Sequence, residues 1–336
     1  MISKTLFFAL LEIVLVVCQA CTAKKAPPPF VIPNIVDATI SLRDVPSDFV
    51  LNPKTNTLYV AYSQIPEIAV VDLSTDRSRT CSYPNVLRTI SLRQPASALA
   101  LNSEDNLLYL LSLKPPLFQV VHLENDTILP ALLLPHKPTS MAVNPTTHKI
   151  YITHQNDEKV SVIDGLTYQV TTEIKVGSKP TGIAVNPQTN QIYVANTEDD
   201  TLSVIDGESD KVIATIPVES RPSHLVVNPL TKKVYVTNSR SNTLSVINGD
   251  TYKVDGILAV EESPYGMDLN LKNNLLYVAN RKSQTISVIN SLSNRILTTF
   301  PAGRDPLKLV INPEMNDLYF TNKGQSLILM VHIQVK

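Results

Sequence analysis

The chain has 336 residues, of which 43% are hydrophobic and 18% are charged. This balance excludes an intrinsically disordered chain, because disorder requires low hydrophobicity together with a high net charge. Lys and Arg number 29 against 30 Asp and Glu, so bulk charge provides no attraction for nucleic acid or for a membrane surface. The three cysteines exclude a disulfide scaffold, since two of them lie near the N-terminus and only Cys81 remains in the body.

Residues 1–20 have the order of parts that is typical of a signal peptide. Lys4 precedes an apolar run, 6–17, which is too short to span a bilayer because a span needs roughly 20 residues. The segment Cys18-Gln19-Ala20-Cys21 resembles a bacterial lipoprotein lipobox, with a small residue before the second cysteine. The resemblance implies that Cys21 is acylated and anchors the protein to a membrane, and simple secretion is the alternative.

Residues 21–34 are predicted to form a tether. Pro27, Pro28 and Pro29 follow two lysines in this segment, a composition typical of an extended and semi-rigid linker. Such a tether would hold the folded body away from a membrane. We therefore expect an exported protein of the periplasm or cell envelope.

The rest of the chain is built from an internal repeat. An Asn recurs at Asn52, Asn102, Asn144, Asn186, Asn228, Asn270 and Asn312, with a first spacing of 50 residues and later spacings of 42. A Tyr follows each of these Asn residues by 7 positions. A constant period of this length is the signature of a solenoid or propeller.

Each repeat reads as four short strands. In the fourth copy these are residues 183–185, 191–196, 201–206 and 212–216. The first turn, 186–190, contains an Asn, a Pro that presets φ and a final Asn that tolerates the left-handed conformation. Four strands in about 40 to 45 residues indicate a propeller blade.

The two ends of the repeat region predict a closed ring. The last repeat has three strands, ending with residues 327–332, whereas residues 38–40 have the spacing to Pro46 that a fourth strand has to the next repeat. The N-terminal strand is therefore expected to complete the last blade, which leaves no open sheet edge. We predict an all-β fold, a seven-bladed β-propeller of four-stranded blades over residues 35–336.

The repeat resembles the YVTN family of bacterial and archaeal β-propellers. The resemblance is carried by residues 193–196, 235–238, 277–280 and 203–206, and the last position of the motif departs from it at Tyr62, Ser112 and His154. It implies the propeller fold and leaves the activity open, because relatives include surface-layer proteins, lactonase-like propellers and domains attached to redox enzymes.

Two sets of loops lie on one face of the disc, which we call the top face. One set precedes the first strand of each blade, and the other set joins the second and third strands. Nearly every loop of the first kind carries a cation: Arg43, Arg93, Lys137, Lys179, Arg221 and Arg304. Such a ring could bind phosphate or carboxylate groups. A rim of mixed charges with weak ion pairs is the alternative, and nucleic acid is not expected because no aromatic platform accompanies the cations.

Four residues depart from the small side chains expected where the blades converge on the central channel: His224, Asp268, Lys308 and Asp48. His224 near Asp268 would form a general base with an orienting carboxylate, or half of a metal site. The alternative is a water-filled channel in which Asp268 pairs with Lys308.

Three functions fit these observations. The first is a membrane-tethered, non-catalytic binding or scaffold module without a cofactor, which is monomeric and engages a protein or glycan of the cell envelope through its top face. The second is a lactonase- or lyase-like hydrolytic enzyme at the channel mouth, with a divalent metal as its candidate cofactor. The third is an accessory protein of a periplasmic redox system.

Overall fold

The computed structural model describes residues 30–31, 36–74 and 86–335. The expected signal peptide and Cys21 lie outside the described residues, as does most of the expected tether. The chain divides into two compact units, one of which spans residues 33–332. In the other unit, β1 (Phe30–Val31) pairs antiparallel with β31 (Gln334–Val335). Within the described ranges, no helix is long and apolar enough to cross a membrane.

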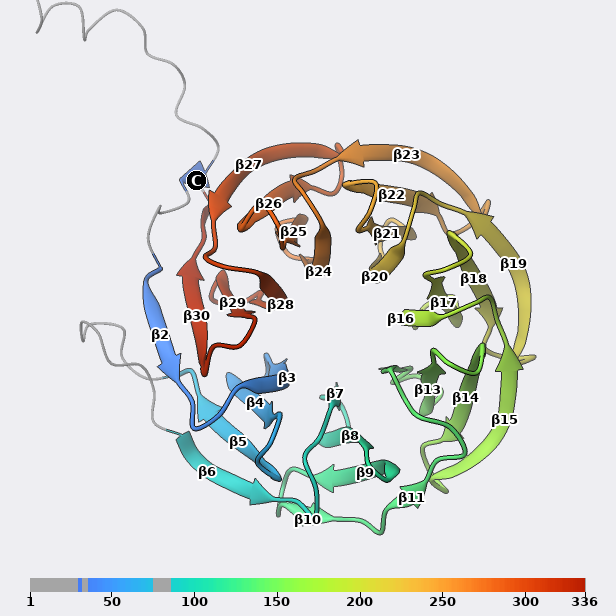
Figure 1. The fold of residues 1–336 in the computed structure, drawn as a ribbon, viewed down its shortest axis with the longest axis vertical. Coiled ribbons are helices and arrows are strands. Elements are labelled where there is room, and N and C mark those ends of the chain that lie inside the picture. Colours follow the sequence, from blue (N-terminus) through green and yellow to red (C-terminus); the bar gives the residue numbers. More distant parts are fainter. Residues whose placement is uncertain (1–29, 32–35, 75–85, 336) are drawn as a thin grey trace, which may run out of the picture. The chain divides into compact units, whose positions relative to one another are not determined.

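The larger unit consists of seven antiparallel sheets arranged as the blades of a ring (Figure 1). Blade 1 comprises β3 (Pro46–Asn52), β4 (Thr57–Tyr62), β5 (Glu67–Asp72) and β6 (Val86–Ser91). Blade 2 comprises β7 (Ala98–Asn102), β8 (Leu107–Leu113), β9 (Pro116–His122), β10 (Thr127–Ile128) and β11 (Leu132–Leu133). Blade 3 comprises β12 (Ser140–Val143), β13 (Lys149–His154), β14 (Lys159–Asp164) and β15 (Gln169–Lys175).

The later blades are the most regular. Blade 4 comprises β16 (Pro180–Asn186), β17 (Gln191–Asn196), β18 (Thr201–Asp206) and β19 (Lys211–Pro217). Blade 5 comprises β20 (Pro222–Asn228), β21 (Lys233–Asn238), β22 (Thr243–Asn248) and β23 (Lys253–Ala259). Blade 6 comprises β24 (Pro264–Asn270), β25 (Leu275–Asn280), β26 (Thr285–Asn290) and β27 (Arg295–Pro301).

Blade 7 confirms the predicted closure of the ring. It comprises β28 (Pro306–Asn312), β29 (Asp317–Asn322) and β30 (Leu327–His332), and its outermost strand is β2 (Ala38–Ser41). β2 pairs antiparallel with β30, from Ala38 opposite Met330 to Ser41 opposite Leu327. β2, which precedes blade 1 in the chain, therefore completes the sheet of blade 7. The predicted seven-bladed propeller is confirmed.

The hydrophobic core lies between neighbouring blades, which explains the periodic tyrosines. Tyr235 of blade 5 is fully buried with Leu276 and Val278 of blade 6. Its hydroxyl donates to the carbonyl oxygen of Ser291 in blade 6 at 2.6 Å. Tyr235 therefore both fills the space between two blades and links them, whereas the equivalent hydroxyls of Tyr151 and Tyr277 are buried without a hydrogen-bond partner among the described residues.

The periodic asparagines close turns and also join blades. Asn186 accepts a hydrogen bond from the backbone N–H of Gln188 at 3.1 Å, which forms the predicted turn. Asn190 at the end of that turn has the expected left-handed backbone, with φ of 52°. Its side-chain oxygen accepts a hydrogen bond from Asn144 of blade 3 at 2.8 Å. The repeat residues thus satisfy local and interblade hydrogen bonds at once.

Candidate functional site

Two of the six predicted top-face cations form ion pairs. Arg43 lies 3.0 Å from Glu67, and Lys179 lies 2.7 Å from Glu198. Within the described part of the chain, no ion pair is formed by the other four, Arg93, Lys137, Arg221 and Arg304. The six cations therefore differ in their surroundings and do not behave as one uniform ring.

The charges of the top-face loops are unequal around the propeller. The loops of blades 5–7, which we call the basic sector, carry six cations: Arg221, Arg240, Arg281, Lys282, Arg304 and Lys323. Their acids are Glu219, Glu261, Glu262 and Asp305. The corresponding loops of blades 3 and 4 carry Lys137 and Lys179 against Asp157, Glu158, Glu198, Asp199 and Asp200. A face with this dipolar pattern can orient a charged partner.

The channel-mouth residues belong to the innermost strands. Lys308 of β28 forms an ion pair with Asp48 of β3. This differs from the predicted pairing of Lys308 with Asp268. β28 of blade 7 contacts β3 of blade 1, so this ion pair lies where the ring closes.

Both aspartates of the channel mouth bind backbone amides of the next blade. Asp268 accepts hydrogen bonds from its own neighbour Leu269 at 2.8 Å and from Ile311 of β28 at 2.9 Å. Asp48 accepts from Phe49 at 2.9 Å and from Leu99 of β7 at 2.8 Å. An innermost strand has an open edge whose N–H groups need acceptors, so these carboxylates cap the edges of adjacent blades.

His224 of β20 does not hydrogen bond to Asp268 in the described structure. Its ring packs on that of Tyr265, with centroids 4.2 Å apart and planes at 55°. The Arg281 guanidinium lies 4.9 Å from the Tyr265 ring centroid and forms a bidentate pair with Asp305, at 2.6 and 3.2 Å. The His224 Nδ1 atom is buried and has no hydrogen-bond partner among the described residues.

Sequence reasoning missed Tyr265 and Arg281 as members of this cluster. The available signal was Tyr265, the only aromatic residue that directly follows the repeat proline in any of the seven repeats. The stack of His224, Tyr265 and Arg281 could not be read from the spacing, since it combines residues from blades 5 and 6.

Burial shifts the pKa values of two groups at the channel mouth in opposite senses. Burial raises the pKa of Asp268 to about 6, against the opposing effects of its two backbone donors and of Lys308. Burial lowers the pKa of His224 to about 4, and the positive charges of Lys308 and Arg281 act in the same direction. Near neutral pH the imidazole is therefore neutral, and most of the Asp268 carboxyl is ionised.

These shifts predict opposing pH dependences of stability. The raised pKa of Asp268 contributes stability at low pH, and this contribution is lost as the pH rises from about 4 to about 6. The lowered pKa of His224 contributes stability at high pH, and this contribution is lost as the pH falls from about 6.5 to about 4. Each contribution is on the order of 3 kcal/mol, and the two partly cancel in the wild type.

We expect His224→Gln to gain stability relative to the wild type as the pH falls from 6.5 to 4, and Asp268→Asn to lose it. Urea unfolding at a series of pH values measures both curves. Parallel curves for the two variants and the wild type would show that neither group titrates with a shifted pKa.

Comparisons with known proteins support the fold. No family model matches the sequence, and no curated protein matches it. Among solved structures, a chain of hydrazine synthase from Kuenenia stuttgartiensis is similar, with a TM-score of 0.73 and 16% sequence identity. The match covers 87% of this chain and 96% of that chain. At this identity the likeness shows the fold alone, and membership of the YVTN family stays a prediction.

Proposed function

We propose that the protein is an exported, membrane-tethered and non-catalytic binding module that engages an acidic protein or glycan of the cell envelope. The observation that carries the binding role is the basic sector of the top face. Five of its six cations, Arg221, Arg240, Lys282, Arg304 and Lys323, are exposed and form no ion pair within the described ranges. Export and the anchor at Cys21 are predictions from the sequence.

The chemistry of the channel mouth supports binding over catalysis. Both oxygens of Asp268 accept backbone hydrogen bonds, so this carboxylate is engaged in joining blades and does not orient His224. The lactonase- or lyase-like alternative depends on the unpartnered Nδ1 of His224. A histidine with a pKa of about 4 is a weak general base, because such catalysis is most efficient when the pKa lies near the working pH.

The predicted role as a redox accessory protein has no support beyond the fold. The similarity to hydrazine synthase is at a level that shows the propeller and says nothing of partners.

Charge reversal tests the proposed face. We expect the combined variant Arg221→Glu, Arg240→Glu and Lys282→Glu to bind heparin or polyglutamate more weakly by about tenfold or more, because it replaces attraction by repulsion. The two probes represent an acidic glycan and an acidic polypeptide, and surface plasmon resonance on the full chain at two salt concentrations measures both.

A matched control carries the same change in charge on the opposite face. Lys211, Lys253 and Arg295 are exposed, begin the outermost strands of three consecutive blades and follow turns away from the top face. Their combined replacement by Glu is expected to leave binding within about twofold of the wild type. Equal losses in the two variants would show that net charge governs binding, and the proposal for the top face would then be wrong.

A further inference from the structure

Blade 2 interrupts the regularity of the propeller at its outermost strand. In blade 4 this strand, β19, is continuous, whereas in blade 2 it is split into β10 and β11, which pair with different parts of β9. Pro130 lies in the gap and has no N–H to donate to β9. The N–H of Leu129 still reaches the carbonyl of Val120 at 2.9 Å, so the break begins at the proline.

A buried polar pair of the repeat is also altered in blade 2. In blade 4, Asn196 donates to Ser203 at 2.8 Å, and in blade 3 His154 and Ser161 form the same contact at 2.8 Å. The equivalent positions of blade 2 hold Ser112 and Gln119. The larger polar group has therefore moved from the second strand of the blade to the third.

Gln119 is left without a donor for its amide oxygen. The side chain is 4% exposed, and its Oε1 atom has no hydrogen-bond partner in the part of the chain that the structure describes. A buried polar atom without a partner is costly, and most such atoms in proteins are satisfied by protein, water or ligand. The amide oxygens of Asn196, Asn280 and Asn322 in regular blades are also unpartnered among the described residues, and Gln119 differs from them in lining a cavity.

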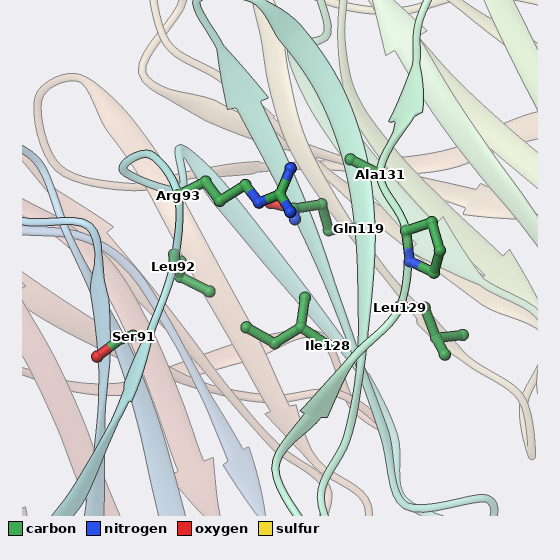
Figure 2. Close-up of a pocket in the computed structure, with 8 residues that line it drawn as sticks. Ser91, Leu92, Arg93, Gln119, Ile128, Leu129 and Ala131 are labelled. Atoms are coloured by element: carbon green, nitrogen blue, oxygen red, sulfur yellow. The ribbon is translucent and has the colours of Figure 1, made fainter.

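Gln119 lines a cavity of about 560 Å³ at the break in the strand (Figure 2). Its apolar lining includes Leu92, Ile128, Leu129 and Pro130, and Ser91 also borders it. Arg93 is the charged residue that lines it, and in Figure 2 the side chains of Arg93 and Gln119 extend toward one another. The volume lies in the range of small-molecule sites, which combine apolar walls with a few polar groups.

We propose that this cavity binds an N-acylated aliphatic amino acid, free or as the last residue of a peptide. A guanidinium matches a carboxylate through two parallel hydrogen bonds. The Gln119 side-chain amide lines the same cavity and can hydrogen bond to the amide group of the ligand, and the aliphatic side chain lies against the leucine, isoleucine and proline walls. This site is separate from the basic sector, and its test does not depend on the proposed function.

N-acetyl-leucine is the probe, titrated into the full chain and followed by NMR, with an expected dissociation constant of about 1 mM or lower. N-acetyl-leucinamide lacks the carboxylate and is expected to bind at least about tenfold more weakly. Comparison with a tripeptide that ends in leucine distinguishes the free amino acid from a peptide terminus, since the tighter ligand identifies the source.

Arg93→Gln and Gln119→Met are each expected to weaken binding of N-acetyl-leucine by about tenfold or more. Arg304→Gln is the matched control, because Arg304 has the same position relative to the proline of blade 7 and is also exposed without an ion pair in the described ranges. It should bind as the wild type does. Since Arg93 is exposed, its replacement leaves the fold intact, which the melting temperature checks.

Two results would overturn the proposal. One is the lack of any binding by N-acetyl-leucine or the tripeptide at about ten times the expected dissociation constant. The other is equal binding of the acid and the amide, or an unchanged affinity of Arg93→Gln, since either shows that the guanidinium does not hold a carboxylate.

Discussion

Gly266→Ala is expected to destabilise the propeller by about 3 kcal/mol, one of the largest effects of a single methyl group in this chain. A Cβ atom at position 266 would lie 2.0 Å from the carbonyl oxygen of Leu307. That oxygen belongs to the backbone of β28, so the clash is relieved only by moving the innermost strand of blade 7. Urea unfolding followed by circular dichroism measures the loss, because the chain has no Trp for fluorescence.

Gly256→Ala is the control for this prediction. Gly256 lies in the outermost strand of blade 5, and a Cβ atom there meets nothing within 4 Å. The substitution is expected to be neutral or to stabilise by up to about 1 kcal/mol, because alanine restricts the unfolded chain more than glycine does. Similar destabilisation by both substitutions would contradict the idea that close approach of blades 6 and 7 requires glycine at position 266.

Ile40→Asp is expected to destabilise the protein by more than about 4 kcal/mol. Ile40 of β2 is fully buried with Phe49 and Leu58 of blade 1 and with Ile328 of blade 7. The substitution removes this packing and places a carboxylate in the apolar contact that closes the ring. The free energy of unfolding in urea and the susceptibility of residues 36–45 to proteolysis both report the opening.

Thr39→Asp tests the alternative that any charge on β2 is disruptive. Thr39 is exposed and precedes Ile40 on the same strand, so its side chain points to the opposite face. This change is expected to alter stability by less than about 0.5 kcal/mol. If Thr39→Asp and Ile40→Asp unfold at the same urea concentration, burial of Ile40 is not what secures the closure.

Much of the fold follows from patterns that are local in the chain. The repeat of Asn and Tyr predicts the number of blades, and the turn that ends at Asn190 was predicted with its left-handed residue. The closure by β2 was predicted because the spacing of residues 38–40 to Pro46 matches that of a fourth strand. Hydrogen bonds of turns and adjacent strands involve neighbours in sequence, so residue type and spacing are enough to identify them.

The candidate sites were predicted less completely. His224, Asp268, Lys308 and Asp48 were identified as departures from the repeat, but their partners were not. Lys308 was expected to pair with Asp268 and instead pairs with Asp48, which is 260 residues away in the chain. The cavity beside Gln119 was not predicted. It requires the break in the strand at Pro130 and the contact with Arg93, which follows the outermost strand of blade 1.

The sequence alone determined the all-β class, the seven blades, the strand order within each blade and the closure of the ring. These features depend on a periodic pattern of strands and turns, and each repeat has the same spacing of strand and turn residues. Only the tertiary structure decided which charged groups pair, which acceptors remain unmet and where a cavity opens. These contacts join side chains of different blades, and their geometry depends on how tightly adjacent blades pack and on the rotamers that packing leaves available.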